Sequence, residues 1–249
     1  MGLLSLALLA QPAFNAARHY PEMLARRQVE VGPAARRAMG GPLGQGALIA
    51  GYWNDITPLR YVQKVEGLRP DVWIVATDGR GMRLLLERAL DQRRPYYVAR
   101  QTAAGLRLLP LPVWDAGVIS HPAEQRVNRA VRWHGHDLWP ARPRAGDSLA
   151  LTLYWAVDEP PQEDWITFIQ VLDERDEKWA QVDRTPGGEI YPFREWAPGT
   201  LLADQYELAL PAEMPAGRYR IIFGWYRAGE RLAWADGLDT HTLAEFVVE

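Results

Sequence analysis

A change of pattern after Pro112 limits the folds open to this chain. From residue 127 to residue 248, short segments in which apolar and polar residues alternate are separated by Pro, Gly and Asp. The expected strands are 127–136, 148–157, 164–173, 178–183, 204–210, 218–226 and 243–248. Short strands with a turn every ~8–12 residues are typical of an antiparallel β-sandwich. We therefore expect a sandwich, Ig-like or jelly-roll-like, in the second half.

The residues before Pro112 alternate instead between strand and helix patterns. Thr57-Pro58 predicts a helix start, with Thr57 as N-cap and Pro58 at the first helical position, and Gly67 predicts its end. The apolar run 71–76 predicts a strand covered on both faces. The other expected elements are strands 47–53, 95–100 and 105–112, the last an edge strand, and a helix at 82–94. Such alternation predicts a small parallel-sheet α/β domain over 1–115, followed by the β-sandwich domain over 116–249.

Charge is divided unequally between the two halves. Residues 1–115 carry 15 Lys and Arg against 9 Asp and Glu, whereas residues 116–249 carry 13 against 22. The basic residues of the first half are scattered, so no nucleic-acid partner is expected. The chain has no cysteine, which excludes disulfides and thiolate metal sites. The glycine-rich stretch 40–46 precedes a strand rather than following it, so it is not a phosphate loop, and no cofactor is expected.

The first 15 residues contain an apolar run, Leu3–Ala10, that is too short to cross a bilayer. The segment lacks the basic region of a secretory signal. Three interpretations remain: the start of a buried helix, a weak signal sequence, or the end of a longer membrane helix. Residues 16–30 fit an amphipathic helix.

Asn54, Asp55 and Asp78 follow the first two expected parallel strands. Ligands bind at the carboxyl ends of strands in open α/β sheets, so these side chains are candidates to bind a sugar hydroxyl or a cation. The structural alternative is that Asp55 joins Thr57 in capping a helix and that Asp78 stabilises a turn. The helix-capping alternative is favoured for Asp55.

Two further groups carry possible chemistry. His134 and His136 have an i, i+2 spacing that places both on one face of a strand, with Asp137 as a possible oxygen ligand, but no partner pair completes a zinc site. Of the 11 tryptophans, Trp165, Trp179 and Trp196 lie near expected strand ends and are candidates for a sugar-stacking platform, whereas Trp155 and Trp225 lie inside apolar strands and are expected in the core. Surface and interface positions are the alternatives.

One stretch of the first half carries the pattern "Y-x-Q-x-V-x-G-x-R-P-D-V", matched by Tyr61, Gln63, Val65, Gly67, Arg69, Pro70, Asp71 and Val72. With this pattern the first half resembles the soluble carboxyl-terminal region of bacterial membrane proteins related to protein O-mannosyltransferases. The stretches "AGDSLALTLYW", "AQVDRTPGG" and "W-x-PG" resemble the β-sandwich appended to many of these proteins. The family's catalytic portion is a series of membrane helices, which this sequence does not contain, so the resemblance carries over no catalytic residue.

Two functions from different classes follow as hypotheses. The resemblance implies a non-catalytic accessory region of a membrane glycosyltransferase-like system at the extracytoplasmic face of the cell membrane. Its partners would be a glycan and a membrane-embedded glycosyltransferase-like protein or a missing amino-terminal region. The alternative is a free-standing enzyme, soluble in the cytoplasm, that acts on a carbohydrate or a phosphorylated small molecule in the crevice near Asn54, Asp55 and Asp78.

Overall fold

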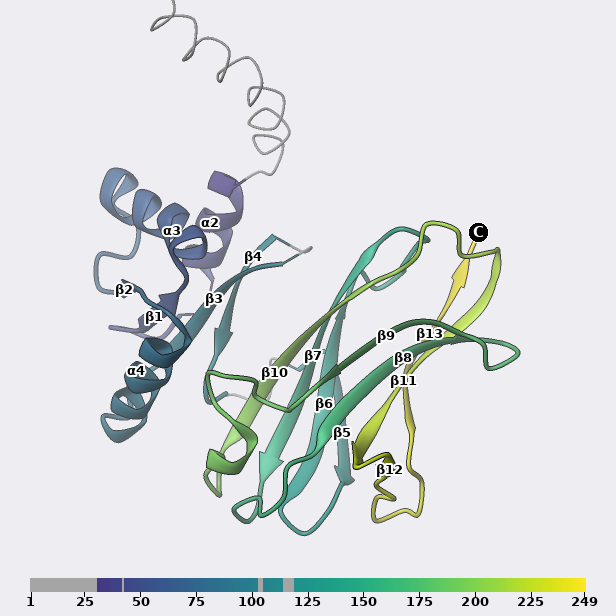
Figure 1. Ribbon diagram of the computed structural model, residues 1–249. Coiled ribbons are helices and arrows are strands. Elements are labelled where there is room, and N and C mark those ends of the chain that lie inside the picture. Colours follow the sequence, from purple (N-terminus) through teal and green to yellow (C-terminus); the bar gives the residue numbers. More distant parts are fainter. Residues whose placement is uncertain (1–30, 42, 103–104, 114–118) are drawn as a thin grey trace, which may run out of the picture.

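The computed structural model describes residues 31–41, 43–102, 105–113 and 119–249. In these residues an open sheet with flanking helices packs beside two antiparallel sheets (Figure 1). The expectations for residues 1–15 and 16–30 lie outside the described residues. No helix within the described part of the chain has the length and apolar character needed to cross a membrane.

The first half forms a four-stranded mixed sheet. Its elements are α2 (Val31–Gly40), β1 (Leu48–Gly51), α3 (Trp53–Glu66), β2 (Trp73–Ala76), α4 (Gly79–Asp91), β3 (Tyr96–Thr102) and β4 (Gly105–Pro110). The strand order is β2-β1-β3-β4, in which β1 pairs in parallel with β2 and β3, and β3 pairs antiparallel with β4. The predicted parallel sheet is therefore confirmed for three strands, and β4 is an antiparallel edge.

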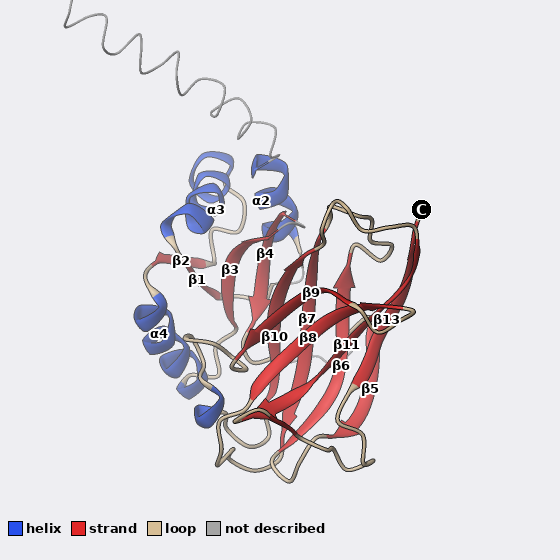
Figure 2. Ribbon diagram, turned by 45° about the vertical axis from the view of Figure 1, so that its right-hand side comes forward, coloured by secondary structure: helices blue, strands red, loops and turns tan. Residues whose placement is uncertain are grey.

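Helices cover both faces of this sheet. Ile49 of β1 packs in the core formed with α2 and α3, whereas its neighbours Leu48 and Ala50 pack in the core formed with α4. Figure 2 shows α2 and α3 above the sheet and α4 below it. The chain leaves β1 toward β2 through α3, then crosses to the other side of β1 through α4 and enters β3. The order of the strands thus reverses between β1 and β3.

Two local predictions for this half are wrong. The run 71–76 was expected to be covered on both faces, but β2 is an edge strand and the Trp73 side chain is 63% exposed, beneath the guanidinium of Arg94. Helix α3 begins at Trp53, before the Thr57-Pro58 signal, and its N-cap residue Tyr52 makes no side-chain cap. The Thr57 hydroxyl instead donates a hydrogen bond to the Trp53 carbonyl. The end at Gly67 is confirmed, with a left-handed φ of 71°.

Residues of the "Y-x-Q-x-V-x-G-x-R-P-D-V" pattern hold the α3–β2 connection together. The Gln63 amide donates to the carbonyls of Arg69 at 2.9 Å and Val72 at 2.7 Å. Arg69 pairs with Asp71 at 2.8 Å, and the other Asp71 oxygen accepts from the Gly46 N–H at 3.1 Å. These bonds lower the pKa of Asp71, first through the hydrogen bond from Arg69. The pattern has a structural role in this connection.

The second half is built of two antiparallel sheets. Its strands are β5 (His121–Arg126), β6 (Val131–Trp139), β7 (Ser148–Val157), β8 (Ile166–Asp173), β9 (Lys178–Arg184), β10 (Leu201–Ala209), β11 (Gly217–Arg227), β12 (Glu230–Arg231) and β13 (His241–Val248), with a short 3-10 helix η2 (Phe193–Glu195). One sheet has the order β10-β7-β6-β5. The other has the order β12-β11-β8-β9, with β13 also paired to β11. The predicted antiparallel strands are confirmed, and β5 is an additional polar edge strand.

Aromatic side chains fill the space between these sheets. Trp155 and Trp225 are fully buried, as predicted, with ring centroids 5.0 Å apart. The same hydrophobic core continues into the first half, where Met82 and Leu86 of α4 and Tyr96 of β3 belong to it. The open sheet and the sandwich are therefore packed against each other through apolar side chains.

Candidate functional site

A cavity of about 770 Å³ lies between the open sheet and the sandwich. One wall of the cavity belongs to the first half and consists of the end of β1, of β3 and of the region of β4. The other wall belongs to the second half and consists of the turn after β9 and of strand β10. The lining residues are Tyr52, Val98, Arg100, Gln101, Thr102, Leu109, Leu111, Arg184, Thr185, Gly187, Gly188, Glu189, Ile190, Tyr191, Trp196, Leu202, Ala203, Asp204, Gln205 and Glu207. The size falls within the range of ordinary ligand pockets.

The position of the cavity follows from the topology of the sheet. Tyr52 follows the last residue of β1, and Arg100, Gln101 and Thr102 form the carboxyl end of β3. These two strands flank the point at which the strand order reverses, where open α/β sheets place their ligands. Here the sandwich closes one side of that crevice.

Several polar side chains of the lining have no hydrogen-bond partner among the residues that the structure describes. They come from both walls and include groups that only donate, groups that only accept and groups that do both. They are the Tyr52 hydroxyl, the Arg100 guanidinium, the Gln101 amide, the Thr185 hydroxyl, the Glu189 carboxylate and the Gln205 amide. The cavity therefore presents a set of polar groups available to a ligand.

Arg184 forms a fixed charged part of the wall. Its Nη2 donates to Asp204 Oδ1 at 2.5 Å and to the Gln205 carbonyl at 2.6 Å, and its guanidinium lies 4.4 Å from the centre of the Tyr206 ring. Asp204 is 3% exposed, and its second oxygen accepts from the Tyr206 hydroxyl at 2.5 Å. Burial raises the pKa of the Tyr206 hydroxyl well above its ordinary value, and the Asp204 charge adds to this effect.

The segment 185–196 covers the cavity on the sandwich side. Its turn is fixed by the Trp196 indole N–H, which donates to the Tyr191 carbonyl at 2.8 Å, and by the Tyr191 hydroxyl, which accepts from the Ala197 N–H at 3.2 Å. Gly187 has a φ of 75°, and a Cβ atom there would overlap the Tyr191 carbonyl oxygen. Only glycine fits this turn without displacement.

Polar contacts also tie the two walls together. Arg83 of α4 forms an ion pair with Glu195 of η2, and the Val113 N–H donates to the Leu201 carbonyl at 2.7 Å. The cavity is thus bordered by contacts that hold the open sheet against the sandwich.

The three candidates at the carboxyl ends of the strands, Asn54, Asp55 and Asp78, have different surroundings in the structure. Asp78 is the N-cap of α4 and accepts from the Gly81 N–H at 2.8 Å, which matches the turn-stabilising alternative. Asp55 lies in the first turn of α3, and its Oδ1 accepts from the N–H of the cavity residue Gln101 at 2.9 Å. Burial raises the pKa of the Asp55 carboxyl, against the opposing effects of this bond and of Arg100. Asn54 is exposed beside it.

The three tryptophans proposed as a stacking platform do not come together. Trp196 lines the cavity but is only 1% exposed, because its ring packs against Phe193 and its indole N–H is bonded to the Tyr191 carbonyl, so it offers no open face for stacking. Trp165 precedes β8 and lies beneath the guanidinium of Arg227. Trp179 lies at the opposite end of the β8–β9 pair and donates to Asp173.

His134 and His136 do not share a face of β6. A β-bulge between Trp133 and Gly135 shifts the register, so His136 faces the core with Trp133 while His134 pairs with Glu124 outside. The same-face prediction is therefore wrong. Asp137 is occupied by the Ser120 N–H and the Tyr154 hydroxyl. No group of three or more His, Cys, Asp or Glu side chains in the described ranges is arranged to hold a metal ion.

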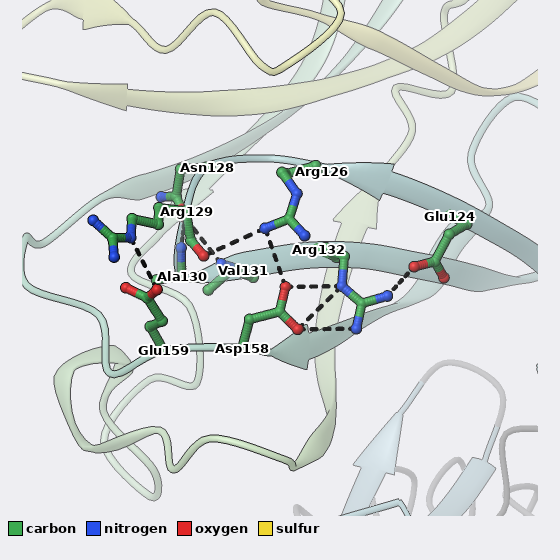
Figure 3. Close-up of polar contacts among 9 residues, drawn as sticks. All are labelled: Glu124, Arg126, Asn128, Arg129, Ala130, Val131, Arg132, Asp158 and Glu159. Atoms are coloured by element: carbon green, nitrogen blue, oxygen red, sulfur yellow. Dashed lines mark hydrogen bonds and ion pairs between the residues drawn. The ribbon is translucent and has the colours of Figure 1, made fainter.

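A second hollow, of about 560 Å³, lies on the sandwich at the β5–β6 end and is lined only by charged residues (Figure 3). Arg132 pairs with Asp158 at 2.9 Å and also with Glu124. Arg126 pairs with Asp158 at 3.2 Å, and Arg129 pairs with Glu159 at 2.9 Å. Each arginine already has a carboxylate partner, so this hollow has fewer free hydrogen-bonding groups for a ligand than the cavity has.

The sequence predictions did not single out Arg100, Gln101, Arg184, Glu189 or Gln205. Arg100 and Gln101 could have been found, because Arg100 ends the expected strand 95–100 and Gln101 follows it, as Asn54 follows the first strand. The sandwich residues carry no such signal, since only the packing of the two halves brings them to this crevice.

Comparisons with known proteins give no family. No protein-family model matches the chain, and no curated protein matches it. Among solved structures, a glycosyl hydrolase family 2 member from Bacteroides cellulosilyticus is 9% identical with a TM-score of 0.30, covering 46% of this chain and 14% of that one. The C-terminal domain of wzt is 10% identical with a TM-score of 0.33, covering 52% and 80%. Spo0M from Bacillus subtilis is 15% identical with a TM-score of 0.27, covering 49% and 50%. Similarities of this size carry no argument about function.

Proposed function

We propose that this chain is a non-catalytic glycan-binding module and that its ligand site is the cavity between the open sheet and the sandwich. The observation that carries the proposal is a set of polar side chains that have no hydrogen-bond partner among the described residues and lie on both walls of a cavity at the reversal point of the sheet. Pockets with a few converging polar groups at this position are the usual ligand sites of open α/β sheets.

The chemistry of these groups favours a neutral, hydroxyl-rich ligand. Arg100 can only donate hydrogen bonds and Glu189 can only accept them, whereas the amides of Gln101 and Gln205 do both. A sugar hydroxyl also donates and accepts, so one sugar can satisfy all three kinds of group. The charges of Arg184 and Asp204 neutralise each other, and the rest of the lining carries one cation, Arg100, against two carboxylates, Glu189 and Glu207. The lining therefore has no excess of positive charge that would call for an anionic ligand.

The place of the module in a larger system is part of the proposal. The likeness of the "Y-x-Q-x-V-x-G-x-R-P-D-V" pattern to proteins related to O-mannosyltransferases supports an accessory role beside a membrane-embedded glycosyltransferase-like partner, at the extracytoplasmic face.

Tryptophan fluorescence can test the proposal, because Trp196 forms a buried part of the cavity wall. Mono- and oligosaccharides of mannose, glucose and N-acetylglucosamine would be titrated into the whole chain. We expect saturable changes that disappear in Arg100→Ala and Glu189→Ala. Arg129→Ala is the matched control, because Arg129 is 87% exposed in the separate charged hollow. Absence of saturable binding by every saccharide would overturn the proposal.

The second candidate function is an enzyme acting on a carbohydrate or phosphorylated small molecule in the same crevice. The raised pKa of Asp55 favours it, because a carboxyl group of this kind suits proton transfer and Asp55 is bonded to the cavity residue Gln101. If this function holds, Asp55→Asn abolishes turnover of glycosides or sugar phosphates while the ligand still binds. If the unmodified protein binds the ligand but does not turn it over, the enzyme function is refuted and the glycan-binding function stands.

A further inference from the structure

Two polar side chains of the cavity, one from each half of the chain, converge on a single point above Gly79. Glu189 Oε2 lies 3.3 Å, and the Tyr52 hydroxyl 3.6 Å, from the position that a Cβ atom on Gly79 would take. Glu189 Cβ lies 3.9 Å from the same position, so the Glu189 side chain extends over this glycine. Neither oxygen has a hydrogen-bond partner among the residues that the structure describes. The two walls of the cavity therefore bring a carboxylate and a hydroxyl together.

The fold accounts for this convergence. Tyr52 follows β1, and Gly79 begins α4 shortly after β2, the strand paired in parallel with β1, so both residues lie at the carboxyl edge of the sheet. Glu189 reaches the same edge from the segment of the sandwich that covers the cavity. The ion pair between Arg83 of α4 and Glu195 of η2 fixes that segment to the helix.

The amino end of α4 does not use the Glu189 carboxylate as its cap. The N-cap residue is Asp78, whose side chain accepts from the Gly81 N–H at 2.8 Å. In the described part of the chain, no hydrogen bond joins Glu189 to a backbone N–H of this helix. The carboxylate is therefore available to a ligand.

We propose that Tyr52 and Glu189 act as one specificity-determining pair that binds adjacent hydroxyls of a single sugar, and that Gly79 is the residue that leaves room for this pair. Hydrogen bonds between oxygen atoms are about 2.8 Å long, so two groups this close to one point reach the same hydroxyl or neighbouring ones. The carboxylate accepts from a sugar hydroxyl, and the phenol donates or accepts. This inference rests on the proposed glycan-binding function and adds that the sugar presents free adjacent hydroxyls and bridges the two halves.

Gly79→Ala tests the Tyr52–Glu189 pair without removing a hydrogen-bonding group. The added Cβ atom would lie 3.3 Å from Glu189 Oε2, so the carboxylate at the end of this flexible side chain must shift. Gly79 has no left-handed φ, and alanine is a better helix former than glycine, so the substitution should not lower stability. The matched control is Gly40→Ala in α2, where nothing lies within 4 Å of the new Cβ atom.

Isothermal titration calorimetry of the whole protein measures the affinities. The probes are the methyl glycosides of mannose, glucose and N-acetylglucosamine and their monodeoxy derivatives. We expect Tyr52→Phe to lower the affinity for a bound sugar about twofold to tenfold and Glu189→Gln to lower it about tenfold to a hundredfold. Gly79→Ala should lower it at least about threefold at an unchanged melting temperature, and Gly40→Ala should not lower it.

The monodeoxy probes identify the hydroxyls that the pair binds. In the unmodified protein, removal of either of two adjacent hydroxyls should lower the affinity. In the double variant Tyr52→Phe with Glu189→Gln, removal of the same hydroxyls should have little further effect, because their protein partners are already lost. A double variant that remains as sensitive to these hydroxyls as the unmodified protein would refute the pair.

The variants also separate this inference from the function beneath it. If sugars bind and Glu189→Gln alone lowers the affinity, while Tyr52→Phe and Gly79→Ala do not, the pair is refuted and the cavity remains a sugar site. Equal losses of affinity in Gly79→Ala and Gly40→Ala also refute the pair, because they reflect a general effect of the substitution. If none of the saccharides binds to the unmodified protein, both the proposed function and this inference fall.

Discussion

Nη2 of Arg184 on β9 donates a hydrogen bond of 2.5 Å to Oδ1 of Asp204 on β10, and this bond joins the edge strands of the two sandwich sheets. Asp204 is almost fully buried, and its other oxygen is taken by the Tyr206 hydroxyl. The Arg184 side chain keeps about a third of its surface exposed, on the side of the cavity. The same pair therefore closes the edge of the sandwich and forms part of the candidate site.

Asp204→Ala should destabilise the protein, because it leaves the Arg184 cation without its buried partner. Loss of one member of a buried pair costs about 3–5 kcal/mol, and the partial exposure of Arg184 reduces the expected loss to about 2–3 kcal/mol. Urea unfolding followed by circular dichroism measures the free energy of unfolding.

The control is the double variant Arg184→Gln with Asp204→Asn, which removes both charges and keeps polar groups at both positions. It should recover part of the stability lost in Asp204→Ala. A loss below about 0.5 kcal/mol in Asp204→Ala would show that the pair is no more important than an exposed one.

His136 should make the protein less stable in acid. Burial lowers the pKa of its ring to about 4, and the nearby His121 adds to the effect against the opposing charge of Asp137. The unfolded chain, with an ordinary histidine pKa of about 6.5, takes up a proton first. Stability is therefore full above about pH 6.5 and falls as the pH drops toward 4, by about 2 kcal/mol.

Comparison of unfolding free energies at pH 7.5 and pH 4.5 checks this prediction. His136→Phe should reduce the difference between the two pH values. Part of it should persist through His241, whose pKa is also lowered by burial. His134→Gln, which removes a partly exposed histidine from the same strand, is the control and should not reduce the difference as His136→Phe does. A His136→Phe protein as acid-sensitive as the unmodified one would contradict the assignment.

The sequence predicted elements where a local signal decides the structure. The apolar stretch 148–157 forms β7 with the same bounds, and Gly67 ends α3 because it alone adopts the left-handed conformation there without strain. The start of α3 was missed because its N-cap, Tyr52, makes no side-chain cap that a sequence could show. The bulge at Trp133–Gly135 was missed because an alternating pattern does not reveal one extra residue in a strand.

The candidate site was predicted only on one side. Asn54 and Asp55 were chosen by the rule that ligands bind at the carboxyl ends of parallel strands. Neither lines the cavity, and Asp55 is connected to it only through the Gln101 N–H. The opposite wall is contributed by residues such as Arg184 and Glu189, more than 80 positions beyond Arg100 in sequence. Their approach depends on the packing of the sandwich against the sheet, to which no short sequence pattern corresponds.

Gly187→Ala should disrupt the segment that covers the cavity. Gly187 and Gly199 both have left-handed φ values, 75° and 78°, so alanine at either position costs about 1 kcal/mol in backbone strain. At Gly199 nothing lies near the new Cβ atom, whereas at Gly187 it would overlap the Tyr191 carbonyl and lie 2.8 Å from Trp196 Nε1. Thermal unfolding should show a larger loss of stability in Gly187→Ala than in Gly199→Ala, together with a changed Trp196 fluorescence. Equal losses of stability in the two variants would show that the turn at Gly187 shifts to accommodate the added Cβ atom without further cost.

Gln63→Ala should test whether the pattern that resembles the membrane-protein family is structural in this chain. The substitution removes the two hydrogen bonds to the Arg69 and Val72 carbonyls and leaves these groups without that donor, at a cost of about 1–2 kcal/mol. Lys64→Ala, at the adjacent exposed position of α3, is the control and should change stability by less than about 0.5 kcal/mol. Because Gln63 lies away from the cavity lining, saccharide affinity should stay the same in Gln63→Ala at temperatures where it remains folded. A stable Gln63→Ala protein with lost saccharide affinity would instead assign the pattern to ligand binding.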